Sequence, residues 1–213
     1  MMNLPVSQAG FLVTDLVKAI VAERDHLSEI DGAIGDGDHG VNMAKGFNLC
    51  AQALGTPTPG LKESLGILGN TLMAGIGGSM GPLYGTFFNE MADSLDGVTE
   101  LDASAFGRMI RAGLDGVLDI GGAKPGDKTL LDTLVPAVEA FEAAVSAGKP
   151  YRVALDDMVE AARKGRDSTV AMIAKVGRAS RLGERSRGVM DAGSASCCII
   201  LETLAASVAT KLD

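Results

Sequence analysis

The stretch Asp31-Gly-Ala-Ile-Gly-Asp36-Gly-Asp38-His39-Gly-Val-Asn42 places three carboxylates close together in the chain, separated mainly by glycine and small residues. Glycine adopts positive φ without strain, so the segment can fold back on itself and gather these carboxylates. Gathered carboxylates repel one another unless a cation lies among them. Oxygen ligands without cysteine favour Mg²⁺, Mn²⁺ or Ca²⁺ over Zn²⁺, and Mg²⁺ commonly shares its coordination with phosphates. The stretch therefore predicts a metal site that also takes a phosphate compound.

Two known loop motifs overlap this stretch, and the sequence argues against both. The glycines of residues 35–40 have the G-x-G-x-x-G spacing of dinucleotide-binding loops, but residues 28–34 make no convincing strand before them. A calcium-binding loop counted from Asp36 would have Phe47 at its twelfth position, where a bidentate glutamate is required. An acidic, glycine-rich surface turn is the plain alternative, because Asp and Gly are common in turns.

The composition limits the class of protein. The 213 residues fit a single domain over 1–213, and 46% hydrophobic residues can build a sizeable core. With 27 acidic and 19 basic residues the net charge is −8, which disfavours nucleic acid as a partner. Three cysteines form no disulfide framework and indicate a reducing compartment, so we expect a cytoplasmic protein. The sequence shows no signal peptide and no long apolar run, so we expect no membrane span.

The spacing of the apolar residues predicts an all-α protein. Apolar residues recur at intervals of three and four, as on one face of a helix. We expect eight helices and no convincing strand, with the helices over residues 6–29, 39–54, 61–75, 82–95, 103–121, 128–147, 151–176 and 193–211. Pro136 falls inside the sixth helix, where we expect a kink. Such a pattern is typical of a helical bundle or barrel.

Three further glycine-rich segments are candidates for contact with phosphate. Residues 75–85 surround Ser79 and lead into a helix, which can present bare N–H groups, although a tight helix corner explains the glycines equally well. Residues 121–129 nearly match a Walker loop, but Asp127 intrudes and no strand precedes them, so only another kind of nucleotide contact is left open. Residues 177–193 are rich in arginine, whose planar fork matches phosphate oxygens. A solvated basic loop is the alternative for this last segment.

Four segments, occurring in order, carry a resemblance to a known family. They are residues 34–42, 77–88, 124–129 and 177–186. In these motifs, and over essentially all of its length, the chain resembles the nucleotide-binding L subunit (DhaL) of dihydroxyacetone kinase. The resemblance implies an eight-helix antiparallel barrel with the nucleotide at one end.

The resemblance also implies a role for individual residues. Asp31, Asp36 and Asp38 would hold two Mg²⁺ that bridge the phosphates of ADP or ATP, and Arg178 would be a catalytic residue that contacts phosphate. Further nucleotide-contacting positions would be His39, Gly40, Val41, Asn42, Ser79, Met80, Gly121, Leu130, Met190, Asp191 and Ala192. Two positions depart from the family pattern: Met80 stands where a hydroxyl residue is frequent, so that Ser79 is a candidate replacement, and Ala192 stands in place of a proline, which makes its loop less rigid.

The function that the resemblance implies is that of half an enzyme. In the family the ketose lies on a separate K subunit, and this chain contains no such domain. In the phosphotransferase-linked members, bound ADP accepts phosphate from a phosphohistidine protein and passes it to dihydroxyacetone, and a free-standing L chain favours this type. An ATP-dependent kinase subunit for dihydroxyacetone or a related ketose is one alternative. A non-catalytic nucleotide-sensing module is the other, and the complete aspartate trio argues against it.

Overall fold

The computed structural model describes residues 4–212 and confirms the predicted all-α fold. Its α-helices are α1 (Phe11–Ala22), α2 (Arg24–Ile34), α3 (His39–Leu54), α4 (Leu61–Gly75), α5 (Met80–Asp93), α6 (Ala103–Gly121), α7 (Leu131–Ser146), α8 (Tyr151–Ser168) and α9 (Ala192–Ala209). Three 3-10 helices accompany them, η1 (Val6–Gln8), η2 (Thr169–Ala171) and η3 (Arg178–Ser186). Within the described range, β-pairing is limited to one isolated bridge between Pro5 and Glu100.

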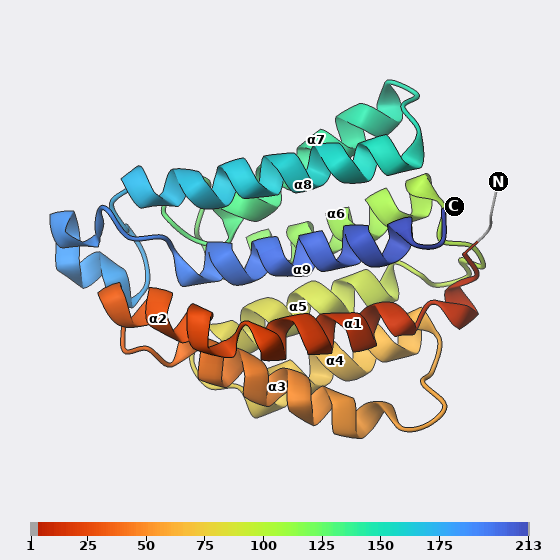
Figure 1. The fold of residues 1–213 in the computed structure, drawn as a ribbon, viewed down its shortest axis with the longest axis horizontal. Helices are drawn as coiled ribbons and strands as arrows, with labels where there is room; N and C mark the ends of the chain where they lie inside the picture. Colours follow the sequence, from red (N-terminus) through yellow and green to blue (C-terminus); the bar gives the residue numbers. More distant parts are fainter. Residues whose placement is uncertain (1–3, 213) are drawn as a thin grey trace.

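Eight of these helices form a closed ring. From α3 to α9 each helix packs against the next, while α1 packs between α9 and α3 and so completes the circle (Figure 1). The short α2 continues beyond α1 and leans on α3. Because the connections alternate between the two ends, neighbouring helices run antiparallel, as the family resemblance implied.

The ring encloses a core of aliphatic side chains with a few aromatic ones. The largest fully buried side chains include Phe47, Phe88, Phe106 and Phe141. Phe47 meets Phe88 edge-on with ring centroids 6.1 Å apart, and Phe106 lies 5.1 Å from Phe141. These edge-on and tilted pairs stabilise the core beyond the area that they bury. The core thus fixes the helices whose ends carry the polar connections.

The first predicted helix, over 6–29, is divided in the structure. The α-helical pattern stops at Glu23, whose φ of −90° and ψ of 8° leave the helical region, and α2 begins at the next residue. This second helix then continues to Ile34, so Asp31 lies on its last turn rather than in a loop. The apolar pattern missed the break because both pieces bury leucine, Leu12 and Leu16 in α1 and Leu27 in α2.

Two other predicted helices are shorter than the sequence indicated. The helix predicted over 128–147 begins only at Leu131, because the Asp132 carboxylate accepts the backbone N–H groups of Gly126 and Thr129 and so holds the preceding residues as a turn. The helix predicted over 151–176 ends at Ser168, and the arginine-rich residues after it fold in part as η3. Helix α7 contains Pro136 within its length, and the kink expected there stays a prediction.

Helix α9 is the one helix of the described chain that is long and apolar enough to cross a membrane by length and composition. In the structure 67% of it is buried inside the molecule, where it packs against α1, α7 and α8 (Figure 1). A helix that is apolar on all sides is expected at the centre of a bundle as well as in a membrane. Its two cysteines and Cys50 are buried and free, in agreement with the absence of a disulfide framework.

Four connections meet at one end of the barrel, on the left in Figure 1. They join α2 to α3, α4 to α5, α6 to α7, and α8 to α9. The described chain begins and ends at the opposite end, with η1 and the end of α9. Consequently the N-termini of α3, α5, α7 and α9 all lie at this end of the barrel. The four motifs of the sequence are brought together there.

Candidate metal and phosphate site

A cavity of about 630 Å³ lies where these four connections meet, a size typical of small-molecule sites. Every connection contributes to its wall, as the sequence motifs predicted. The predicted site residues in the wall are Asp31, Asp36, Asp38, His39, Asn42, Ser79, Met80, Gly121, Leu130, Arg178, Asp191 and Ala192. Residues that are distant in the chain therefore share a single cavity.

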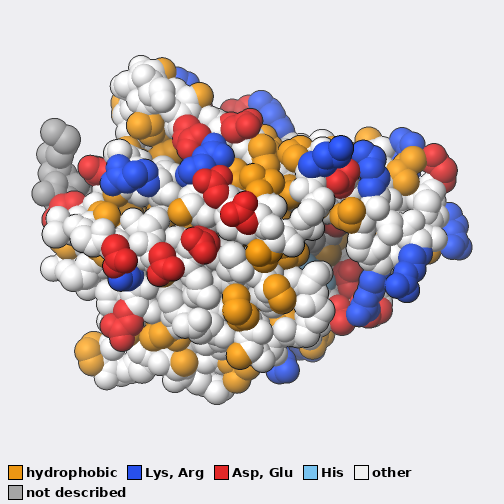
Figure 2. Space-filling model, turned by 180° about the vertical axis from the view of Figure 1, so that it is seen from behind, with side chains coloured by type: hydrophobic (Ala, Val, Ile, Leu, Met, Phe, Trp, Pro, Cys, Tyr) orange, Lys and Arg blue, Asp and Glu red, His pale blue; other side chains and the backbone are white. Residues whose placement is uncertain are grey.

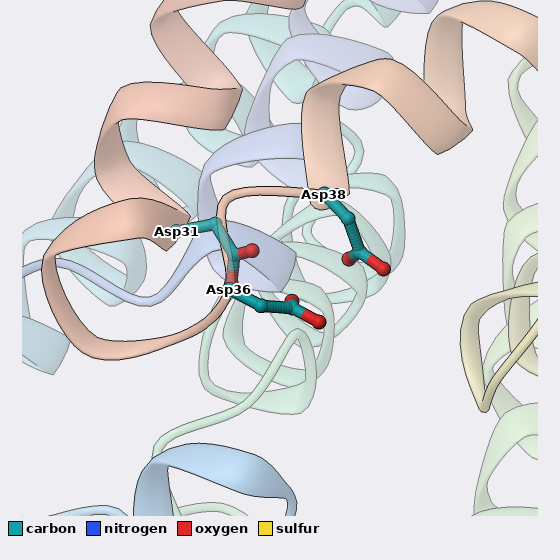
Figure 3. Close-up of side chains that lie close together, drawn as sticks. All are labelled: Asp31, Asp36 and Asp38. Atoms are coloured by element: carbon teal, nitrogen blue, oxygen red, sulfur yellow. The ribbon is translucent and has the colours of Figure 1, made fainter.

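The three aspartates of the opening stretch converge on one side of this cavity (Figure 3). Asp31 comes from the last turn of α2, Asp36 from the connection, and Asp38 immediately precedes α3. One carboxylate oxygen from each lies within 4.8 Å of the others. Gly37, with a φ of 75°, supplies the tight turn between the last two aspartates.

This arrangement fits a divalent cation. Ligands about 2.1 Å from a Mg²⁺ can lie up to about 4.2 Å apart on opposite sides of it, so small side-chain movements suffice to bring all three carboxylates onto one ion. The described chain offers no other group of three or more His, Cys, Asp or Glu side chains at such spacing. The oxygen-only donor set favours a hard cation.

His39 occupies the start of α3 and is held as a neutral imidazole. Its ring Nε2 lies 2.9 Å from the Ser196 hydroxyl, and its backbone N–H donates to the Asp31 carboxylate at 3.4 Å. Burial lowers the pKa of His39 to about 4, against a smaller upward effect of the Asp31 charge. At neutral pH this side chain therefore adds hydrogen-bonding capacity to the cavity without adding charge.

A buried hydroxyl network supports His39 from behind. The Tyr84 hydroxyl lies 2.6 Å from the Ser196 hydroxyl and donates to the Gly193 carbonyl at 3.1 Å. Burial raises the pKa of Tyr84 well above its usual value, so the phenol stays protonated. The network joins α5, α9 and the start of α3, and it thereby fixes the imidazole position.

Four helix N-termini face the cavity. Its wall includes the first residues of α3, α5, α7 and α9, which are His39, Met80, Leu131 and Ala192. The first turn of a helix leaves backbone N–H groups without partners in the helix and carries the positive end of the helix dipole. Four such ends favour an anion in the cavity even though the protein as a whole is acidic.

Arg178 opens η3 and reaches the aspartates. Its guanidinium forms an ion pair with the Asp36 carboxylate, and its side chain is 62% exposed. Figure 2 shows Lys and Arg side chains gathered at the end of the molecule that carries η3, beside acidic ones. The arginine that sequence comparison singled out thus lies at the edge of the carboxylate cluster.

The wall of the cavity also contains a carboxyl group with an unusual environment. Asp191 caps α9 by accepting the backbone N–H of Ser194 at 2.7 Å. Burial raises the pKa of Asp191 to about 6, although this hydrogen bond and the Lys128 charge oppose the shift. Part of the negative charge of the site is therefore titratable near neutral pH.

Three predicted contact residues lie outside the cavity wall. A Cβ on Gly40 would come within 1.9 Å of the Arg24 carbonyl, so this glycine allows α3 to pass close to α2. Val41 is 44% exposed on the outer side of α3, and Met190 is half-buried beside the cavity. A nucleotide contact for these three stays a prediction.

Sequence reasoning missed several residues of the wall. Tyr84, Lys128 and Thr129 line the cavity, yet none was assigned a role. The signal was present, because Tyr84 belongs to the glycine-rich segment around Ser79, and the other two belong to the rejected Walker-like loop. The Tyr84 and Lys128 side chains form hydrogen bonds with residues distant in sequence, which periodicity does not reveal.

Together these features define a class: an all-α barrel with one end suited to a hard cation and an anionic ligand. The chain belongs to the DAK2 domain family, whose model matches residues 33–206. Among its relatives is the ADP-binding subunit DhaL of a PEP-dependent dihydroxyacetone kinase from Listeria innocua, 38% identical over 92% of this chain and 91% of the relative. The corresponding Escherichia coli subunit is 39% identical over 86% of this chain and 88% of the relative.

Solved structures show the same fold. The dihydroxyacetone kinase of C. freundii in complex with AMP-PNP and Mg²⁺ aligns with a TM-score of 0.70 and 24% identity over 96% of this chain. This chain spans only 35% of that longer kinase. Longer curated relatives also exist, such as the D-erythrulose kinase of Mycolicibacterium smegmatis, which is 33% identical and of which this chain covers 33%.

Proposed function

We propose that this protein is the ADP-binding subunit of a dihydroxyacetone kinase of the phosphotransferase-dependent type. ADP held in the cavity with Mg²⁺ accepts a phosphoryl group from a phosphohistidine protein and passes it to dihydroxyacetone on a separate K subunit. The observation that carries the proposal is the meeting of three carboxylates and four helix N-termini in one cavity. Two curated relatives that match over nearly their whole length carry this activity in their names.

The carboxylates and the helix N-termini would have different roles, the first in binding metal and the second in binding phosphate. Asp31, Asp36 and Asp38 would hold Mg²⁺. Two ions are what the family resemblance implies. Bound Mg²⁺ supplies neutralisation of the charge on the transferred phosphoryl group. The helix N-termini would bind the phosphate oxygens that the metal leaves free.

Arg178 and His39 would complete the phosphate side. The Arg178 guanidinium can move from the Asp36 carboxylate to a phosphate oxygen, since its planar group of N–H donors binds either anion. The neutral imidazole, fixed by Ser196, would hydrogen-bond to the nucleotide without repelling the metal. Neither side chain needs to become covalently modified, so the phosphoryl group passes directly between nucleotide and partner.

The apolar part of the wall would take the nucleoside. Met80, Leu130 and Gly121 line the cavity together with Leu83 and Val117. A wall of this kind can pack against a flat base. We propose a cytoplasmic location, since the three free cysteines suit a reducing compartment. The proposed partners are the K subunit and the phosphohistidine protein.

Reconstitution tests the proposal. The purified chain is mixed with a K subunit and dihydroxyacetone, and it receives either ATP or a phosphorylated phosphotransferase protein as the donor. We expect bound ADP to survive gel filtration with Mg²⁺ and to be lost with a chelator, and turnover to require the phosphorylated protein. Turnover with ATP alone, with free exchange of ADP, would assign the protein to the ATP-dependent type. Nucleotide retention without turnover under either donor would favour a sensing module.

A further inference from the structure

Lys128 is a buried cation that the proposed function leaves unused. Its side chain is only 2% exposed, although it lies in the α6–α7 connection at the cavity wall. Its φ of 64° makes it the only non-glycine residue with positive φ in the described part of the chain. A non-glycine residue persists in this conformation only where its surroundings hold it there.

The surroundings are three backbone carbonyls. The Lys128 ammonium donates to the carbonyl oxygens of Met172 at 3.2 Å, Ser186 at 2.5 Å and Val189 at 2.7 Å. An ammonium group has three N–H donors, so each one has an acceptor. A neutral amine would have only two donors and would turn a lone pair toward an oxygen, so this geometry requires the charged form.

The three acceptors enclose the segment that carries Arg178. Met172 follows η2, Ser186 is the last residue of η3, and Val189 lies just beyond it. The residues on both sides of segment 173–185 are therefore bound to the same nitrogen atom, Nζ of Lys128. Other bonds close the same base: the Ser186 hydroxyl accepts the Ala174 N–H at 2.9 Å, and the Gly188 N–H donates to Val170 at 2.8 Å.

Near this base the segment has one further attachment, at Lys175, whose N–H donates to the Asp127 carbonyl at 3.1 Å and whose ammonium lies 3.5 Å from the Asp127 carboxylate. Asp127 precedes Lys128 in the α6–α7 connection, so this contact also fastens the segment there, and farther out η3 packs on α2. Within η3 only Ser186 is buried, and Gly183 interrupts the helical conformation. At its outer end Arg178 pairs with Asp36, an exposed partner of the carboxylate cluster. The position of Arg178 over the site therefore depends on how firmly the base of the segment is fastened.

We propose that Lys128 is a positioning residue, which ties both ends of the 173–185 segment to the α6–α7 connection and so holds Arg178 over the carboxylate cluster. The inference rests on the proposed function for the role of Arg178. The fastening itself does not depend on that role. It follows that removal of the Lys128 ammonium loosens this segment while the barrel stays folded, and that it impairs transfer only through Arg178.

Hydrogen exchange of the nucleotide-free protein tests the fastening without any activity. Lys128→Met keeps the length of the side chain and removes the donors, while Lys124→Met makes the same change at an exposed lysine of the same connection. We expect Lys128→Met to speed amide exchange across 173–190 about tenfold or more, with exchange in α1 and α9 unchanged. Exchange across this segment equal to that of wild type would overturn the proposal.

A double-mutant cycle on phosphoryl transfer tests the route through Arg178. We expect Lys128→Met to lower kcat about tenfold or more with a smaller change in ADP affinity, and Lys124→Met to match wild type. In the Arg178→Ala background the Lys128→Met change should have no further effect on kcat. Two effects that multiply would show that Lys128 acts independently, and the positioning role would be wrong.

A second variant guards against a general folding defect. Lys128→Gln keeps an amide that can donate to two of the three carbonyls, and it enters the same cycle if Lys128→Met does not fold. Failure of both variants to fold would overturn the local role, because Lys128 would then support the whole barrel. If wild-type protein retains no ADP, the proposed function fails while the exchange experiment still decides the fastening.

Discussion

Two hollows, one at each end of the barrel, contain a similar number of carboxylates but differ in how closely these carboxylates approach one another. The hollow at the far end, bounded by η1, α4 and the α5–α6 connection, has Glu63, Asp93 and Asp96 in its wall. There Lys62 forms an ion pair with Asp96, and all three acidic residues are exposed to solvent. At the site end Asp31, Asp36 and Asp38 approach within 4.8 Å of one another. Convergence, and not acidic composition, distinguishes a candidate metal site from a solvated surface.

The same contrast appears in two helix caps. Asp102 caps α6 at the far end by accepting the Ala105 N–H at 2.7 Å, and it is exposed. Asp191 makes the equivalent bond to Ser194, also at 2.7 Å, inside the cavity wall. Burial raises the pKa of Asp191 to about 6. The same cap is therefore exposed at one end of the barrel and lies in the wall of the cavity at the other.

Replacement of Asp36 with Asn should have the largest effect on the site. The change removes one of three convergent charges while it keeps the shape, so we expect Mg²⁺-dependent retention of ADP to be lost. Gel filtration followed by quantification of nucleotide measures this. Mg²⁺ and ADP should also raise the melting temperature of wild type and not that of Asp36→Asn, because a ligand that binds only the native state stabilises it.

Asp96→Asn is the matched control at the far end. It removes a carboxylate that lines the other hollow, and retention of ADP should equal that of wild type. If Asp36→Asn retains ADP as well as wild type does, the convergent aspartates are an acidic turn and not a metal site.

Replacement of Gly40 with Ala should destabilise the protein by about 3 kcal/mol or more, since the new methyl group meets a backbone carbonyl and not a flexible side chain. Gly66→Ala offers the opposite case, because no atom lies within 4 Å of its added Cβ on α4. There we expect a gain of about 0.5–1 kcal/mol from better helix propensity. Urea unfolding of the nucleotide-free variants measures both. Equal stability of the two variants would contradict the close approach of α2 and α3.

The stability of the nucleotide-free protein should fall as the pH rises from about 4 to about 6, in the part due to Asp191. The native pKa is about 6 and the ordinary value is 3.8, so the native state holds the proton to higher pH than the unfolded chain does. The stabilisation from Asp191 is fully present below its ordinary pKa and is lost as the pH rises through its native pKa. It amounts to at most about 3 kcal/mol for a pKa shift of roughly two units.

Asp191→Asn should remove this portion of the pH dependence, since asparagine also caps a helix but does not titrate. The check is the free energy of unfolding of the variant and of wild type, measured across that pH range. If Asp191→Asn keeps the wild-type slope between these pH values, the raised pKa of Asp191 is wrong.

Arg178→Ala should weaken ADP binding or slow transfer by roughly one to two decades, the worth of a charge-assisted contact of about 1.5–3 kcal/mol. The barrel should stay intact, because this side chain is exposed and packs on no core. Arg181→Ala lies on the same 3-10 helix and does not line the cavity, so it serves as the control. Equal losses in both variants would mean that η3 acts through its general positive charge.

Much of the fold was predictable from the sequence, because helices depend on local periodicity. The repeats of leucine and valine gave the number and order of the main helices, and only the break at Glu23 was hidden. The predicted ends of helices were less accurate where a buried side chain accepts hydrogen bonds from backbone N–H groups. Asp132 delays α7, for example, by accepting N–H groups that a longer helix would have used.

The sequence by itself determined the chemistry of the candidate site: the aspartates, glycines and arginine of four motifs name a hard-cation and phosphate site before any fold is known. The tertiary structure alone decided which residues meet. It closed the ring so that four N-termini share one cavity, left Gly40 and Val41 outside its wall, and placed Lys128 against carbonyls more than forty positions away. The reason is physical. Local pattern fixes which groups a segment offers, whereas the contacts of a buried ammonium or a crowded glycine arise only when segments distant in sequence pack together.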